Sequence, residues 1–295
     1  MTLVRNFDAA TASRGAFSYL TSIVGYPTLV WRNRFMVQNF LRRDLLSRVN
    51  GSMLGVGWIL LQPLFLFAVY YLVFGQLLRD RNAGGMSDSG FAIYLFSGVI
   101  VFHALSEATT TSCVMIVDNG NLVKKVAFPS EVMLVHVAAS SIITFLVGAI
   151  VCFIAGWAMG VSQPGWLLLG LPLVMAVQFV LTLGIGLLLA NLYVFLRDTA
   201  QLWRILTMAW MFLSPVFWEP KLLEDKVGPE WMVWIANCNP AFPLIQAYRL
   251  SLGGVSESLG AFWPQLGVAS AWALGLFVIG YVFFMSRKHK YSDLI

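Results

Sequence analysis

The sequence predicts an all-α integral membrane fold, with six transmembrane helices, an N-terminal amphipathic interface helix, and re-entrant half-helices between spans five and six. Two observations carry this prediction. Of the 295 residues, 59% are hydrophobic and only 11% are charged, which leaves too little polar surface to cover a soluble domain. Several stretches without any charge also reach the roughly 20 apolar residues that a helix needs to cross a bilayer. We therefore expect the chain to cross a membrane several times.

The gaps between charged residues place the spans. The second stretch contains Glu107 as its sole charge, and the third is too long for one crossing, but Gly160 to Gly165 with Pro164 offer a turn near its middle. The predicted spans are residues 53–78, residues 91–117, the two halves of residues 132–196, residues 199–218 and residues 259–286. They form one six-span transmembrane domain, residues 51–295.

Residues 1–50 are predicted to form a cytoplasmic segment on the membrane surface. Apolar residues recur at four-residue intervals from Val37 to Val49, with arginines around them, which is typical of a helix lying in the interface over residues 31–49. The uncharged residues 15–31 are short for a span and are interrupted by Gly25 and Pro27, so we expect them to be interfacial too. No compact apolar core with a small-residue cleavage site follows the N-terminus, and we expect no cleaved signal peptide.

Residues 231–248 are apolar and uncharged, yet Pro240 and Pro243 interrupt them. Two short half-helices that dip into the membrane explain this pattern better than a full crossing. Lysines and arginines are concentrated in the segments on one side of the predicted membrane, and this side is expected to be cytoplasmic. Both termini are therefore predicted to lie in the cytoplasm.

The sequence offers little enzyme chemistry. None of its lysines follows a glycine, so the ATP-binding loop that ends in Gly-Lys-Ser/Thr is absent and no catalytic site is expected. Cys113, Cys152 and Cys238 lack paired or metal-like spacing, and we expect neither disulfides nor a metal site. His103 and Glu107 share one helical face. Either they have a proton or metal role, or they face a polar interior or subunit contact together with Ser106, Thr109, Thr110 and Ser112.

The loop between spans two and three carries a resemblance to a known family. Its Asn121-Leu122-Val123-Lys124-Lys125 and Phe128-Pro129 resemble the coupling segment of type-2 ABC-transporter permeases that export bacterial polysaccharides. Further pieces match in order: Arg43-Asp44-Leu45, Asn50-Gly51-Ser52, Leu54-Gly55, Trp58, Gln62-Pro63, Arg197-Asp198, Ser214-Pro215, Asn239-Pro240, Arg249 and Gly253-Gly254. The resemblance covers roughly residues 40 to 290, and the N-terminal extension of about 30 residues departs from it.

The resemblance implies a multi-pass inner-membrane permease that pairs with a second copy of itself and with two cytoplasmic ABC ATPase subunits. Those subunits would bind ATP and Mg, and this chain would hold no cofactor. The substrate would be a lipid-linked O-antigen, capsular polysaccharide or teichoic acid; membrane lipids are expected as partners and nucleic acid is not. A type-2 permease for drugs or lipids and a non-transporting membrane assembly protein remain alternatives. The implied ATPase-coupling residues are Leu122, Val123, Lys124, Lys125, Phe128, Arg42 and Arg43.

A sugar polymer presents hydroxyls and apolar C–H faces, so its path should combine aromatic platforms with small polar groups. Two helical faces fit this description: Phe67, Tyr70, Tyr71 and Phe74 on span one, and Trp203, Thr207, Trp210, Ser214 and Phe217 on span five. The same aromatic residues would also fit a belt that faces lipid. The half-helices would form an outer gate with Trp231, Trp234, Asn239, Pro240 and Arg249, where Arg249 is a candidate contact for a lipid-linked phosphate.

Overall fold

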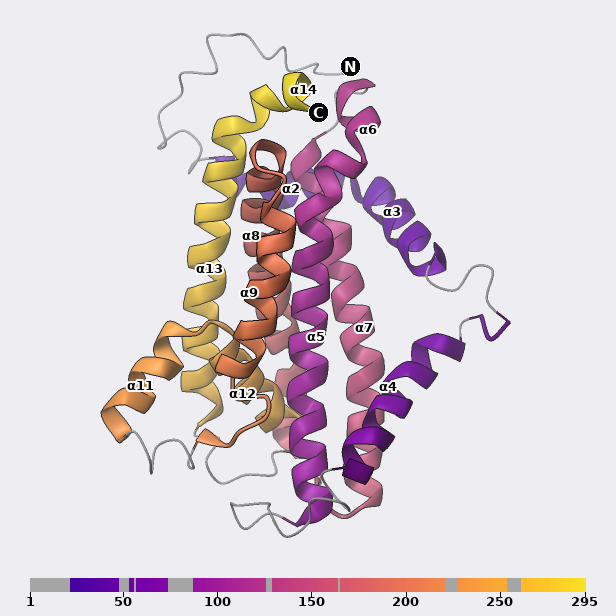
Figure 1. Cartoon of the computed structure of the whole chain (residues 1–295), viewed down its shortest axis with the longest axis vertical. Coiled ribbons are helices and arrows are strands. Elements are labelled where there is room, and N and C mark those ends of the chain that lie inside the picture. The colour runs from indigo at the N-terminus through magenta and orange to yellow at the C-terminus, as the bar shows by residue number, and fades with distance from the viewer. Residues whose placement is uncertain are drawn as a thin grey trace.

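The computed structural model describes residues 22–47, 53–55, 57–73, 87–125, 129–163, 165–220, 228–253 and 261–295. The regular secondary structure of these residues is helical (Figure 1). Its elements are α2 (Tyr26–Arg32), α3 (Arg34–Ser47), α4 (Gly57–Tyr70), α5 (Asp88–Asp118), α6 (Gly120–Lys125), α7 (Ser130–Ala158), η4 (Trp166–Gly170), α8 (Leu171–Phe195), α9 (Thr199–Leu213), α11 (Pro229–Cys238), α12 (Ala241–Ser251), α13 (Phe262–Arg287), η6 (Lys288–Lys290) and α14 (Tyr291–Leu294).

Within the part of the chain that the structure describes, four helices are long and apolar enough to cross a membrane. They cover Ser89–Asp118, Ser130–Ala158, Trp166–Phe195 and Phe262–Lys290, and they correspond to the predicted spans two, three, four and six. The predicted turn between spans three and four is confirmed, because α7 ends at Ala158 and Gly160 adopts the left-handed conformation with φ of 69°. The chain is therefore a helical, multi-pass membrane protein.

The helix of span one begins at Gly57, later than the sequence suggested, and the helix of span five is shorter than predicted. Helix α4 has 14 residues and passes into a π turn that reaches Val73, and residues 74–86 lie outside the described residues. Helix α9 ends at Leu213 instead of Trp218, because Ser214 takes an extended conformation before Pro215. Its 15 residues reach about 22 Å, less than the roughly 30 Å of a bilayer core. The count of six spans stays a prediction.

The predicted surface helix over residues 31–49 is divided and begins earlier than expected. Asn33 ends α2, where its side-chain amide donates to the Leu29 carbonyl at 2.8 Å, and α3 starts directly after it. Helix α3 leaves the bundle at an angle and rests on α7 (Figure 1), where Ser140 Oγ donates to Asp44 Oδ2 at 2.6 Å. Residues 1–21 and 48–50 of the predicted N-terminal segment lie outside the described residues.

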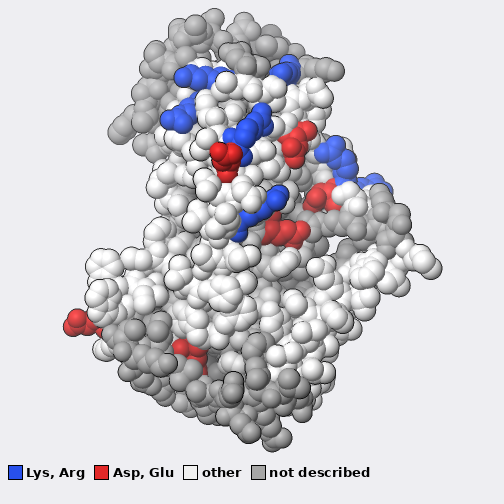
Figure 2. Space-filling model, viewed as in Figure 1, with Lys and Arg blue, Asp and Glu red and all other residues white. Residues whose placement is uncertain are grey.

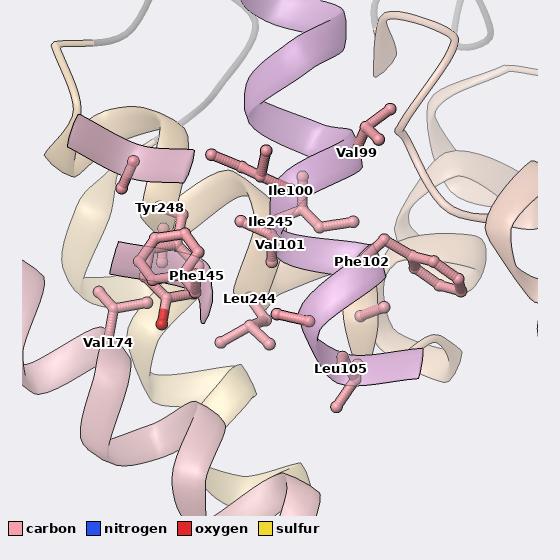
Figure 3. Packing of buried hydrophobic residues seen from close by; sticks show 14 of the residues in the cluster. Val99, Ile100, Val101, Phe102, Leu105, Phe145, Val174, Leu244, Ile245 and Tyr248 are labelled. Atoms are coloured by element: carbon pink, nitrogen blue, oxygen red, sulfur yellow. The ribbon is translucent and has the colours of Figure 1, made fainter. Parts of the chain in front are cut away.

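Helix α5 is the centre of the bundle. It packs against α7 and α8 along its length and also touches α4, α9 and α12, while α13 packs on the other side of α8. In the core, the rings of Phe145 on α7 and Tyr248 on α12 lie 4.3 Å apart, in the same cluster as Ile100 and Leu105 of α5 (Figure 3). Helices in lipid associate largely through such packing.

The predicted half-helices are present as two short helices. Helices α11 and α12 are separated at Asn239 and Pro240, as the prolines in this segment indicated. They lie at the end of the bundle opposite α6 and α14 (Figure 1), and their entry into the membrane stays a prediction. In the view of Figure 2, the described lysines and arginines gather toward the end that carries α6 and α14, which is the end predicted to be cytoplasmic.

Candidate functional site

The candidate site is the side of α5 that the rest of the chain leaves open. From Ala92 to Phe102 every α5 residue is buried, but from His103 onward one stripe along the helix is exposed or half-buried. The His103 side chain is 55% exposed and the Glu107 side chain 31%, and His103 Nδ1 lies 3.9 Å from Glu107 Oε2. Between positions 103 and 111 every residue of this open stripe is polar: His103, Ser106, Glu107, Thr110 and Thr111. We call these five residues the polar stripe.

The predicted aromatic face of span five lies along one edge of α5. Trp203 Nε1 donates to Thr109 Oγ1 at 3.1 Å, and the Trp210 ring meets the Phe102 ring edge-on at 5.3 Å. Thr207 and Ser214 are buried and bond to carbonyls of their own helix. Phe217 is half-buried, with its ring 5.3 Å from that of Phe212. The structure thus brings this predicted face to α5, packed against it in the single chain.

The predicted aromatic face of span one covers α5 further along. Phe67 is buried, and its ring meets Phe96 of α5 edge-on at 5.2 Å. Tyr71 stacks on Phe67 at 6.2 Å, and Tyr70 is half-buried against the same core. Phe74 lies outside the described residues. Because Phe96 precedes His103 by two helical turns on the same face, α4 covers the continuation of the polar stripe.

At the coupling end, α6 follows α5 after the single residue Asn119, so part of this loop is a short helix. Leu122 and Lys124 are exposed, whereas Val123 packs into a core cluster with Ile295. The Lys125 side chain and Phe128 lie outside the described residues. Arg42 and Arg43 lie exposed on α3. The role of these coupling residues stays a prediction.

The C-terminal residues connect the helices at this end of the bundle. Ile295 lies directly against Gly120 of α6, and Lys288 pairs with the buried Glu131 at the start of α7. Tyr291 OH donates to Asn191 Oδ1 on α8 at 2.9 Å. Burial raises the pKa of Tyr291, so its phenol remains a neutral donor at ordinary pH. The sequence did not predict these contacts, because the spacing of the residues along the chain does not indicate that they meet.

The predicted outer-gate residues divide into two groups. Trp231 and Trp234 on α11 are 68% and 69% exposed. Asn239 instead ties the segment to α9, since its Oδ1 accepts from Trp210 Nε1 at 2.7 Å and its amide donates to Ser214 Oγ at 3.0 Å. Pro240 directly precedes α12. The gate function of these residues stays a prediction.

Arg249 is a buried residue that connects several segments of the chain, which the sequence did not reveal. It is only 2% exposed, and it donates to the carbonyls of Pro215 at 2.6 Å and Tyr94 at 2.9 Å. Its guanidinium also lies 3.5 Å from the centre of the Tyr94 ring. A charge inside a membrane protein needs such partners. In this conformation Arg249 joins α12 to α5 and to the segment after α9, and its contact with a lipid-linked phosphate remains a hypothesis.

Comparison with known proteins identifies the family to which the sequence is similar. The model of a family described as ABC-2 type transporter matches residues 37–252. An O-antigen export system permease protein, RfbA, from Myxococcus xanthus is 24% identical over 266 residues, covering 90% of this chain and 97% of the relative. A protein of the same name from Klebsiella pneumoniae is 23% identical over 256 residues, covering 86% and 92%. The similarity thus extends over nearly the whole length of both relatives.

Proposed function

Because the chain belongs to the ABC-2 type transporter family, we propose that it is the transmembrane subunit of an ATP-driven exporter that moves lipid-linked polysaccharide outward across the inner membrane. The observation that carries this proposal is the similarity, nearly end to end, to proteins named as O-antigen export permeases. Their name favours O-antigen over capsular polysaccharide or teichoic acid. Two copies of the chain would form the path between them, as closed two-fold pairs commonly do.

The energy would come from two partner ATPase subunits, which would bind ATP and Mg. Helix α6 is suited to receive their movement, because it exposes Leu122 and Lys124 at the end of the bundle. Only Asn119 separates α6 from α5, and its amide donates to the Met115 carbonyl at 2.9 Å. A displacement of α6 would therefore act directly on α5, the most enclosed of the four long helices.

The test is export of a lipid-linked O-antigen from proteoliposomes that contain the permease and its candidate ATPase. We expect Lys124→Glu to lower export per ATP hydrolysed by at least about tenfold, because the reversed charge would disturb docking of α6. Lys290→Glu is the matched control, since Lys290 is also exposed at this end but lies outside α6, and it should export nearly as the wild type does. If the intact pair moves no polysaccharide, or moves only drugs or free lipids, the proposed function is wrong.

A further inference from the structure

The open sides of the long helices differ in chemistry. On α7 the most exposed residues within the span include Ile150 and Ile154, and on α13 they include Leu274 and Ile279, each more than half exposed. Such residues suit contact with lipid tails. The polar stripe of α5 instead presents an imidazole, a carboxylate and three hydroxyls.

The polar stripe also begins near the middle of the membrane, where contact between polar side chains and lipid tails is most unfavourable. Helix α5 has 31 residues, about 46 Å, so it crosses the whole hydrocarbon layer of roughly 30 Å. His103 is its central residue, and Glu107 follows one turn later. A charged or strongly polar side chain near the bilayer centre is costly unless it faces protein or water. The polar stripe is therefore unsuited to face hydrocarbon.

The polar stripe is open in one direction only. Toward α6 the open side of α5 continues past the half-buried Val114, Met115 and Val117 to the exposed Asp118 at the end of the helix. In the other direction Phe96 lies beneath Phe67 of α4, and the turn of α5 at Tyr94 is held by Arg249. We call this arrangement a half-path. It is a route along α5 that is accessible from the α6 end and blocked by other helices beyond the middle of α5.

We propose that the polar stripe lines a hydrated half-path and binds the hydroxyl groups of a polyol chain; this ligand rests on the proposed function. The Glu107 carboxylate can accept hydrogen bonds from sugar hydroxyls, and the hydroxyls of Ser106, Thr110 and Thr111 can donate and accept. Trp203 and Trp210 lie half-buried along the neighbouring edge of α5, and indole rings suit contact with apolar C–H groups. An acyl chain offers no hydrogen-bond partner to the three hydroxyls.

Hydration is tested by cysteine labelling of the complete complex in nanodiscs. The background is Cys238→Ser, because Cys238 is exposed whereas Cys113 and Cys152 are buried. Ser106→Cys and Thr111→Cys report on the polar stripe, and Ile150→Cys and Leu274→Cys are matched controls on open apolar sides. A charged methanethiosulfonate reacts with the thiolate, which forms only in contact with water, so we expect the polar-stripe cysteines to react at least about tenfold faster.

Equal, slow labelling at all four positions would overturn the hydrated path. A disulfide between two copies at Thr111→Cys without labelling would also overturn it, because the polar stripe would then be a dry subunit contact. This measurement needs no transport, so it separates failure of the half-path from failure of the proposed function.

Polyol binding is tested by export of the same lipid-linked O-antigen. Glu107→Gln and Thr110→Val remove acceptor or hydroxyl groups at nearly constant size, and we expect each to reduce export severalfold while folding and ATP hydrolysis persist. The matched control Thr144→Val removes a half-buried hydroxyl on α7 that bonds to its own helix, the Ser140 carbonyl, and should leave export unchanged. If labelling marks a hydrated stripe but the Glu107 and Thr110 variants export normally, the polyol assignment is wrong.

Discussion

Helices α5 and α13 are both long and apolar enough to cross a membrane, yet the chain covers them to very different extents. The chain itself buries 78% of the most apolar segment of α5 and only 28% of that of α13. The open side is polar on α5 from His103 to Thr111, whereas the most exposed residues of α13 are apolar. Hydropathy therefore identifies a span, while the chemistry of its open side indicates whether lipid or water is its neighbour.

The two helices also differ in how they contact their neighbours. We expect the largest loss of stability from a substitution that disrupts the packing of α13 against α8. A Cβ at Gly280 would clash with the carbonyl oxygen of Gly184, so α13 and α8 approach through their backbones. We expect Gly280→Leu to cost about 4 kcal/mol or more, because the obstructing atom belongs to a backbone that cannot rotate away. Thermal unfolding in detergent, followed by size-exclusion chromatography, measures the loss.

The control for this change lies on the same helix. Nothing lies within 4 Å of a Cβ built at Gly275, so Gly275→Leu should leave the melting temperature nearly unchanged. Equal losses for the two variants would show that glycine itself, and not the close approach to α8, matters on α13.

A smaller effect should come from placing a lysine on each open side. Ile279 of α13 and Ser106 of α5 lie close to the centres of their spans. Ile279→Lys should cost about 2.5–3.5 kcal/mol of insertion free energy, because its charge would face hydrocarbon. Ser106→Lys should cost clearly less if the polar stripe faces water. Membrane insertion assays on both variants compare them, and equal costs would remove the distinction between the two sides.

The sequence predicted the parts of this fold that depend on composition. Long uncharged stretches located the four long helices, and the glycines near position 160 located a turn. It could not predict the burial of Arg249, because the carbonyls that bind it come from residues distant in the chain. The spacing of His103 and Glu107 showed that they share a face, but only packing shows which face is left open. Sequence periodicity likewise missed the break at Asn33, where a local side-chain bond ends the helix.

The smallest expected effect concerns the C-terminal continuation of α13, where side chains rather than backbones make the contact. Tyr291→Phe removes the hydrogen bond to Asn191 Oδ1 and should cost about 1 kcal/mol, since Asn191 still donates to the Phe283 carbonyl. Tyr291→Leu also removes the ring contact with Phe284 at 5.3 Å and should cost more. Thermal unfolding of both variants separates the hydroxyl from the ring. A loss in Tyr291→Phe as large as in Tyr291→Leu would mean that this end is fixed by the hydrogen bond alone, whereas no loss in either would mean that α13 depends only on its approach to α8.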